Sequence, residues 1–117
     1  MKSSLTINIG ELDVNKKYQI IQFNGDFDKV GYDEVHERLN DAVKSFSGDS
    51  LIFDLTNLKF INSEGIGYLM EVHAHLVKDN RKLLIVGPND HVKDVFDTIG
   101  VSEVIPILGD LAVFLKA

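Results

Sequence analysis

Two short apolar runs, LIFDL at 51–55 and LLIV at 83–86, constrain the fold of this chain more than any other feature. Such nearly continuous runs are typical of strands that are covered on both faces. Between them, from about residue 64 to residue 79, apolar side chains recur every three or four positions, which indicates an amphipathic helix. A buried strand, a helix and a second buried strand in succession predict an α/β layer.

The remaining segments alternate between the same two patterns. Leu5, Ile7 and Ile9 alternate with polar residues and predict a half-buried strand, and residues 18–23 predict a second one. Further along the chain, the spacing of apolar residues and the presence of helix-capping residues predict helices at 28–46 and 89–100, a strand at 104–107 and a helix at 111–115. The expected fold is α/β, with a mixed five-stranded sheet flanked by about four helices and an antiparallel opening pair.

The composition limits the function classes that are open to the chain. Its 117 residues suit a single domain, predicted to span residues 1–117. The absence of cysteine excludes a disulfide framework, a thiol nucleophile, an iron–sulfur centre and a Cys-ligated zinc site. A net charge of −6 argues against binding to nucleic acid or to an anionic membrane. No uncharged stretch approaches the length of a membrane span, so a cytoplasmic protein is expected.

One segment combines features that indicate function: residues 58–67 (LKFINSEGIG) follow a predicted central strand and open the next helix. In α/β sheets, the carboxyl ends of strands and the helix N-termini beside them form the usual functional edge. Ser63 is expected at this N-terminus with its hydroxyl at the surface. Gly65 and Gly67 follow it, and each costs roughly 1 kcal/mol of helix stability relative to alanine. We therefore expect a close backbone approach here, made by the chain's own sheet or by a partner.

Several roles are open to Ser63. Ser63 or Asn62 could simply cap the helix, with Glu64 complementing the helix dipole. A nucleophilic serine of the G-x-S-x-G type needs glycine where Ile61 stands, which leaves a small serine hydrolase as a third alternative. A phosphate-binding loop would need a lysine that is missing after the glycines. A regulated serine fits the position, because phosphorylation at a helix N-terminus preserves the fold while repelling a closely packed partner.

The same segment resembles the signature of the STAS domain, the anti-sigma factor antagonist family. In that family a strand reading V-x-x-D-L leads to Asp-Ser-Ser/Thr/Ala-Gly-Leu-Gly. Residues 51–69 (LIFDLTNLKFINSEGIGYL) reproduce the strand, the spacing, the serine and both glycines. Residues 25–28 (GDFD) resemble the family's Gly-Glu/Asp-x-Asp turn, and residues 92–100 resemble its helix before the last strand. The resemblance covers essentially the whole chain and implies a free-standing domain with a STAS-like fold.

The resemblance also implies a non-enzymatic, partner-switching role in bacterial transcription regulation. Family members bind an anti-sigma factor that is also a serine kinase with a GHKL-type ATP fold, and this capture frees the sigma factor. Phosphorylation of the motif serine releases the kinase, and a serine phosphatase resets the cycle. Carried over by position, the phosphorylation site is Ser63. The partner-binding residues implied by the resemblance are Asp26, Asp28, Asn62, Ser63, Glu64 and Gly65. No cofactor and no metal are expected.

Two residues depart from the family pattern. Asn62 replaces the aspartate before the serine; it can still cap the helix, but it lacks the charge that the family presents to the kinase. Glu64 replaces a small residue and moves a negative charge by two positions. These changes leave an alternative open: a STAS scaffold, or a subunit of a larger signalling or transport assembly, that is never phosphorylated.

Other polar residues have simpler interpretations. His73 lies on the apolar stripe of its helix and is expected to be hydrogen-bonded at the edge of the core. His36 and His91 have no histidine four positions away, so no metal site is predicted. Val30 and Tyr32, at the start of the first helix, are expected to border the partner site. The solvated face of that helix accounts for four acids: Asp33, Glu34, Glu37 and Asp41.

Overall fold

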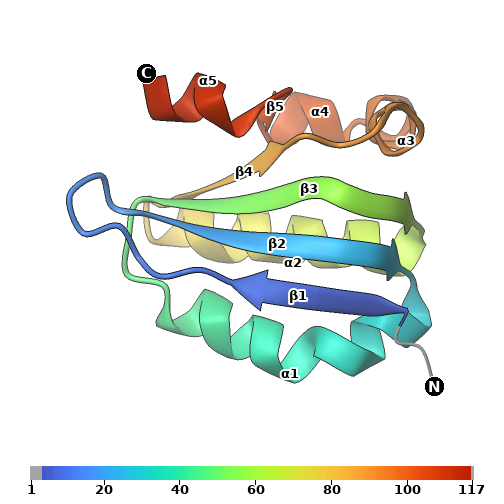
Figure 1. Ribbon diagram of the computed structural model, residues 1–117, viewed down its shortest axis with the longest axis horizontal. Helices are drawn as coiled ribbons and strands as arrows, with labels where there is room; N and C mark the ends of the chain where they lie inside the picture. Colours follow the sequence, from blue (N-terminus) through green and yellow to red (C-terminus); the bar gives the residue numbers. More distant parts are fainter. Residues whose placement is uncertain (1–3, 117) are drawn as a thin grey trace.

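Residues 4–116 are described by the computed structural model, and strands and helices alternate along them (Figure 1). The strands are β1 (Leu5–Ile9), β2 (Tyr18–Phe27), β3 (Ser50–Ile61), β4 (Lys82–Val86) and β5 (Ile107–Leu108). The helices are α1 (Lys29–Ser45), α2 (Ser63–Lys78), α3 (Asp90–Ile99), α4 (Val101–Val104) and α5 (Leu111–Lys116). The longest of these helices, α1, has 17 residues, and none of the helices within 4–116 is suited to crossing a bilayer.

The five strands form one sheet in the order β1-β2-β3-β4-β5. β1 pairs antiparallel with β2, and each later pair is parallel, which confirms the predicted mixed sheet. A helix follows the carboxyl end of each of β2, β3 and β4 before the chain returns to the next parallel strand. The carboxyl ends of β2 and β3 therefore lie at the same edge of the sheet, where α1 and α2 begin.

The hydrophobic core has one part on each face of the sheet. The larger cluster is shared with α1, α2 and α3 and includes the fully buried rings of Phe23, Phe53 and Phe96. The smaller cluster contains Ile52 and Leu84 and packs against residues of α5. Both faces of β3 and β4 are therefore covered, as their apolar runs predict. In Figure 1, α2 lies behind the strands, and α5 lies along the upper side beyond β4.

Strands β2 and β3 extend further than their sequence pattern predicts. They end at Phe27 and Ile61 instead of residues 23 and 55. The register between them shifts after Gln22 and again after Gly25, and each shift adds one residue to β3. The bulges give the buried residues of β3 a three-residue spacing: Leu55, Leu58 and Ile61. A search for alternation with period two cannot detect a strand with that spacing.

The predicted strand at 104–107 is wrong in its position. Gly100 ends α3 in the left-handed conformation, with φ of 96°, and the chain then forms the single turn α4. Val101 and Ile105, four residues apart, are both buried, and the Ile105 N–H donates to the Val101 carbonyl at 2.9 Å. The apolar residues of this segment therefore belong to a helical turn, and β5 begins only at Ile107.

Candidate functional site

Two helices start side by side at the carboxyl edge of the sheet. β2 ends at Phe27 and β3 ends at Ile61, and these two residues are partners in the parallel register. The residue that follows each of them, Asp28 or Asn62, is the N-cap of the next helix. Their backbones are nearly the same, with φ and ψ of −117° and −171° at Asp28 and of −116° and −169° at Asn62. The paired strands thus bring two capped helix N-termini to one surface.

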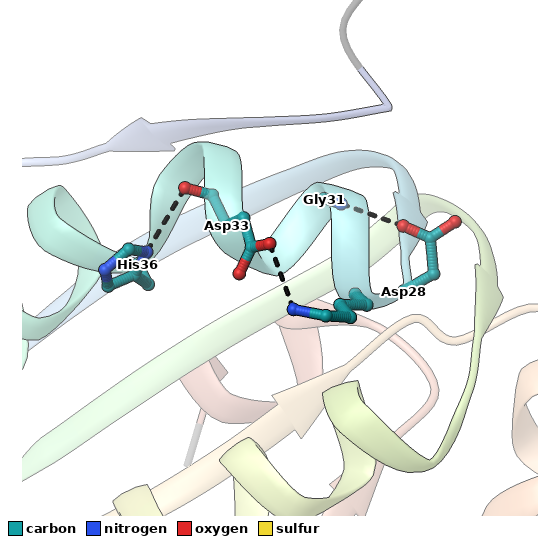
Figure 2. Close-up of polar contacts among 5 residues, drawn as sticks. Asp28, Gly31, Asp33 and His36 are labelled. Carbon is teal, nitrogen blue, oxygen red and sulfur yellow. Dashed lines mark hydrogen bonds and ion pairs between the residues drawn. The ribbon is translucent and has the colours of Figure 1, made fainter.

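Asp28 caps α1 with its carboxylate. Its Oδ1 accepts a hydrogen bond from the backbone N–H of Gly31 at 2.8 Å, as Figure 2 shows. Gly31 has no room for a side chain, because an added Cβ would lie 2.3 Å from the carbonyl oxygen of Asp26. One turn into the helix, Lys29 and Asp33 form an exposed ion pair at 3.2 Å, which stabilises α1 only slightly. Asp28 therefore has a structural role at the edge where the two helices begin.

Asp26 lies within β2 and not in the turn that follows it. Its backbone N–H donates to the carbonyl of Ser4 at 2.7 Å, and its partner in β3 is Phe60. The next residue, Phe27, is fully buried in the larger core cluster. Because side chains alternate along a strand, the side chain of Asp26 points to the opposite face of the sheet. Asp26 is therefore a strand residue, two positions before the cap residue Asp28.

The first turn of α2 contains the other residues of the predicted site. Asn62 Oδ1 accepts hydrogen bonds from the backbone N–H of Glu64 at 3.0 Å and of Gly65 at 3.3 Å. Asn62 is thus the N-cap of α2, and its side chain satisfies two of the free N–H groups at the helix start. Ser63 and Glu64 are both exposed. The hydroxyl-bearing residue therefore lies at the helix N-terminus with a negative charge beside it.

The two glycines of this turn have different surroundings. A Cβ added at Gly65 would lie 2.7 Å from Cγ1 of Ile61, 2.8 Å from the carbonyl oxygen of Phe27 and 2.9 Å from its Cγ. The predicted close approach is therefore made by the chain's own sheet at Gly65. Apart from the adjoining residues and the backbone of its own helix, a Cβ added at Gly67 would meet no heavy atom of residues 4–116 within 4 Å. The fold gives no reason for a glycine at this second position.

A groove between α1 and α2 begins at Ser63. It is lined by Tyr32, Ser63, Glu64, Gly67, Tyr68 and Glu71. The Tyr68 hydroxyl donates to Asn40 Oδ1 at 2.8 Å, and burial raises the pKa of Tyr68, so the phenol stays neutral. The rings of Tyr32 and Tyr68 pack with their centroids 5.5 Å apart. Glu64 and Glu71 are the charged residues of this lining, which makes the groove acidic.

The sequence analysis did not identify Tyr68 and Glu71 as residues that line a groove with Ser63. For Glu71, the helical period could have indicated this. Residues three or four apart lie on one face of a helix, so Ser63, Gly67 and Glu71 follow one another along α2. Tyr32 comes from α1 and lines the same groove as Ser63. The contact between Tyr68 and Asn40 joins residues 28 positions apart. That contact depends on how α1 packs against α2, and no local pattern indicates it.

His73 differs from its prediction in one respect. Its side chain is half-buried in α2, but Nδ1 is buried without a hydrogen-bond partner among residues 4–116. The residues one helical turn away on either side, including Leu69 and Leu76, are apolar and offer no acceptor. Within the same described part of the chain, no three His, Asp or Glu side chains gather as a metal ion would require.

The sequence of the chain matches the model of a known family. Residues 11–113 match the family model of the STAS domain. Because this match covers most of the chain, the protein belongs to the STAS domain family.

The similar proteins are anti-sigma factor antagonists. The anti-sigma F factor antagonist of Paenibacillus polymyxa is 21% identical over 97 residues, which cover 83% of each chain. The crystal structure of an anti-sigma factor antagonist from Mycobacterium paratuberculosis matches with a TM-score of 0.84 at 19% identity, over 99% of this chain and 95% of that one. The unphosphorylated form of the antagonist SpoIIAA matches with a TM-score of 0.75 at 15% identity, over 95% of both chains. The phosphorylated form of the Bacillus cell fate determinant SpoIIAA matches with a TM-score of 0.69 at 14% identity, over 95% of this chain and 98% of that one. At such identities the structural matches show a shared fold.

Proposed function

We propose that the protein is an anti-sigma factor antagonist that captures a GHKL-type serine kinase, itself an anti-sigma factor, until phosphorylation of Ser63 releases it. A serine phosphatase would restore the binding form. The observation that carries this proposal is the exposed Ser63 at the start of α2, on the edge where two capped helices begin. The antagonist role is supported by the relatives, which are anti-sigma factor antagonists. The protein would act by binding, not by catalysis, in the bacterial cytoplasm where sigma factors work.

The proposed contact surface contains Asp28, Asn62, Ser63 and Glu64. The caps formed by Asp28 and Asn62 hold the starts of α1 and α2 in place. Gly65 lies beneath this surface, and its missing side chain lets α2 approach Phe27 closely. Asp26 would contribute a carboxylate at the end of β2, on the face of the sheet opposite to Phe27.

Phosphorylation would act on this surface by charge and bulk. A phosphoryl group adds nearly two negative charges, and the N-terminus of α2 tolerates them because the helix dipole favours negative charge there. Glu64 and Glu71 line the adjoining groove, and the described lining residues include no lysine or arginine to pair with the phosphate. A closely packed complex would have to bury that unpaired charge. The desolvation penalty, together with the added volume, would therefore release the partner while the fold remains intact.

The departures from the family pattern preserve the local charge. Asn62 accepts two capping hydrogen bonds at the start of α2 but carries no charge. Glu64 is exposed two positions later and restores a negative charge at the helix start. The surface offered to the partner thus remains acidic, with its charge on the other side of Ser63.

Intact-mass spectrometry after incubation with ATP and the host's GHKL-type kinases tests the proposal. We expect one added phosphate that maps to Ser63, is absent from Ser63→Ala and is retained in Ser47→Ala, a control at another exposed serine. Stable kinase binding without any phosphate on Ser63 would contradict the switch and favour a constitutive STAS scaffold. Absence of both binding and phosphate would contradict the antagonist role.

Binding measurements with two variants separate capture from release. Ser63→Ala should bind the kinase and resist release by ATP. Ser63→Asp should lose capture, because the charge stands where the partner packs, while its melting temperature stays within a few degrees of the native value. Native affinity in Ser63→Asp would contradict the release by charge.

A further inference from the structure

Gly67, in the first turns of α2, is a glycine that the fold does not explain. Glycine is the poorest helix former after proline, so a glycine inside a helix calls for a reason. Positive φ is not that reason, because the described glycines with positive φ are Gly25, Gly87 and Gly100. Close packing within the chain is not the reason either, because an added Cβ would have open space within 4 Å.

The position of Gly67 relates it to the candidate phosphorylation site. It lies four residues after Ser63, one helical turn further on the same face of α2. Both residues line the groove between α1 and α2, together with Tyr32 and Glu71. A partner that covers Ser63 and extends into this groove must therefore pass over the bare backbone at Gly67.

We propose that Gly67 is a specificity-determining contact, kept without a side chain so that the captured kinase can bring its own backbone against α2. This inference rests on the proposed function and names the place where that partner packs most closely. The carboxylates of Glu64 and Glu71 flank the bare turn, and no basic residue is among the described lining. The kinase segment that enters the groove therefore carries a lysine or arginine side chain that pairs with Glu71, about two helical turns beyond Ser63, so this charge does not pair with a phosphate on Ser63.

Side chains of increasing size at Gly67 test the close approach. Gly67→Ala should raise the melting temperature by about 4 °C, because alanine is the better helix former and the space is open. The same variant should weaken capture of the unphosphorylated protein by the kinase about tenfold, and Gly67→Leu about a hundredfold or more, because each added atom overfills a packed interface. Gly109→Ala is the matched control: its Cβ also meets nothing within 4 Å, but it lies between β5 and α5, outside the groove. Its affinity should be native.

Charge reversal tests the chemistry of the partner. Glu71→Lys should reduce the association rate with the kinase at low salt, and the difference from native should shrink as salt screens the charges. Glu103→Lys, at an exposed position in α4, should leave the rate unchanged. A faster association of Glu71→Lys would overturn the assignment of a basic segment.

The outcomes separate this inference from the proposed function. Native capture by Gly67→Leu, in a protein that still becomes phosphorylated on Ser63, would overturn the role of Gly67 and leave the switch standing. Failure of the native chain to bind any GHKL-type kinase would overturn both. Weakened capture by the Gly67 variants, with a raised melting temperature for Gly67→Ala, would establish that glycine is present here for the partner and not for the fold.

Discussion

Replacing Gly65 with alanine adds one methyl group at the point where α2 lies against β2. On helix propensity alone, the change would stabilise the protein by about 1 kcal/mol. The new carbon, however, would lie 2.7 Å from Cγ1 of Ile61, 2.8 Å from the carbonyl oxygen of Phe27 and 2.9 Å from Cγ of Phe27. Non-bonded carbons pack at about 3.5–4.0 Å, so either these atoms or α2 must move.

None of the three neighbours can move freely. Ile61 is 2% exposed and Phe27 is fully buried, so both side chains are held by the core. The carbonyl oxygen of Phe27 also accepts a hydrogen bond from the Asn62 N–H at 3.2 Å, which links β2 to the start of α2. Overpacking against backbone belongs at the upper end of the usual penalty, about 3 kcal/mol. After the gain of about 1 kcal/mol in helix propensity, the net loss is about 2 kcal/mol.

Thermal denaturation measures this loss directly. At about 4 °C per kcal/mol for a domain of this size, Gly65→Ala should lower the melting temperature by about 8 °C. Gly67→Ala makes the same chemical change two residues later in open space, and it serves as the control for helix propensity because its shift has the opposite sign. A melting temperature for Gly65→Ala at or above the native value would refute the packing argument.

Two further predictions concern hydrogen bonds at helix ends. Asn62→Ala removes the acceptor of two N–H groups and should lower the free energy of unfolding by about 1 kcal/mol, measured by urea denaturation. Asn62→Asp keeps that acceptor and should be as stable as the native protein; an equal loss in both variants would contradict the capping role. At the end of α3, a hydrogen bond from the Ser102 hydroxyl, aided by Lys93, lowers the pKa of Asp97. A carboxyl group whose pKa is lowered by folding contributes stability above its ordinary pKa of about 4, and this is lost as the pH falls further. Ser102→Ala should therefore destabilise the protein more at pH 7 than at pH 2, and an equal loss at both pH values would show that Asp97 is not involved.

The sequence predicts the sheet best where each strand has covered faces. The first half of β3 and the part of β4 after Lys82 are nearly continuous apolar runs, because α1, α2 and α3 pack on one face of the sheet and α5 packs on the other. The prediction fails for the second half of β3, where the two bulges replace the period of two by a period of three. It also fails at residues 104–107, because the buried residues Val101 and Ile105, four positions apart, belong to a helical turn. In both cases the tertiary pairing decides between patterns that are locally ambiguous.

The candidate site also has a part that the sequence predicts and a part that it does not. Asp28 and Asn62 can be predicted as neighbours, because parallel strands end at one edge and cap residues have a recognisable chemistry. The groove could not be predicted, because it forms only when α1 packs on α2, and the partly buried contact between Tyr68 and Asn40 joins residues far apart in sequence. The difference between Gly65 and Gly67 also depends on tertiary structure. The sequence shows two glycines, and only the fold shows which of them contacts the sheet.

The two extra residues of β3 have a consequence for the position of Ser63. Residues at the start of β2 pair with partners 32 positions later, as Tyr18 does with Ser50, but Phe27 at its end pairs with Ile61, 34 positions later. Without the bulges, α2 would begin two residues beyond the level of Asp28, a displacement of about 6–7 Å along the strand. The two extra residues therefore bring the starts of α1 and α2 to the same height along the strands. The length of chain between Leu55 and Ile61 is for this reason as important to the proposed binding surface as the residues exposed on it. An insertion there would misalign the two helix starts without altering any of the proposed contact residues.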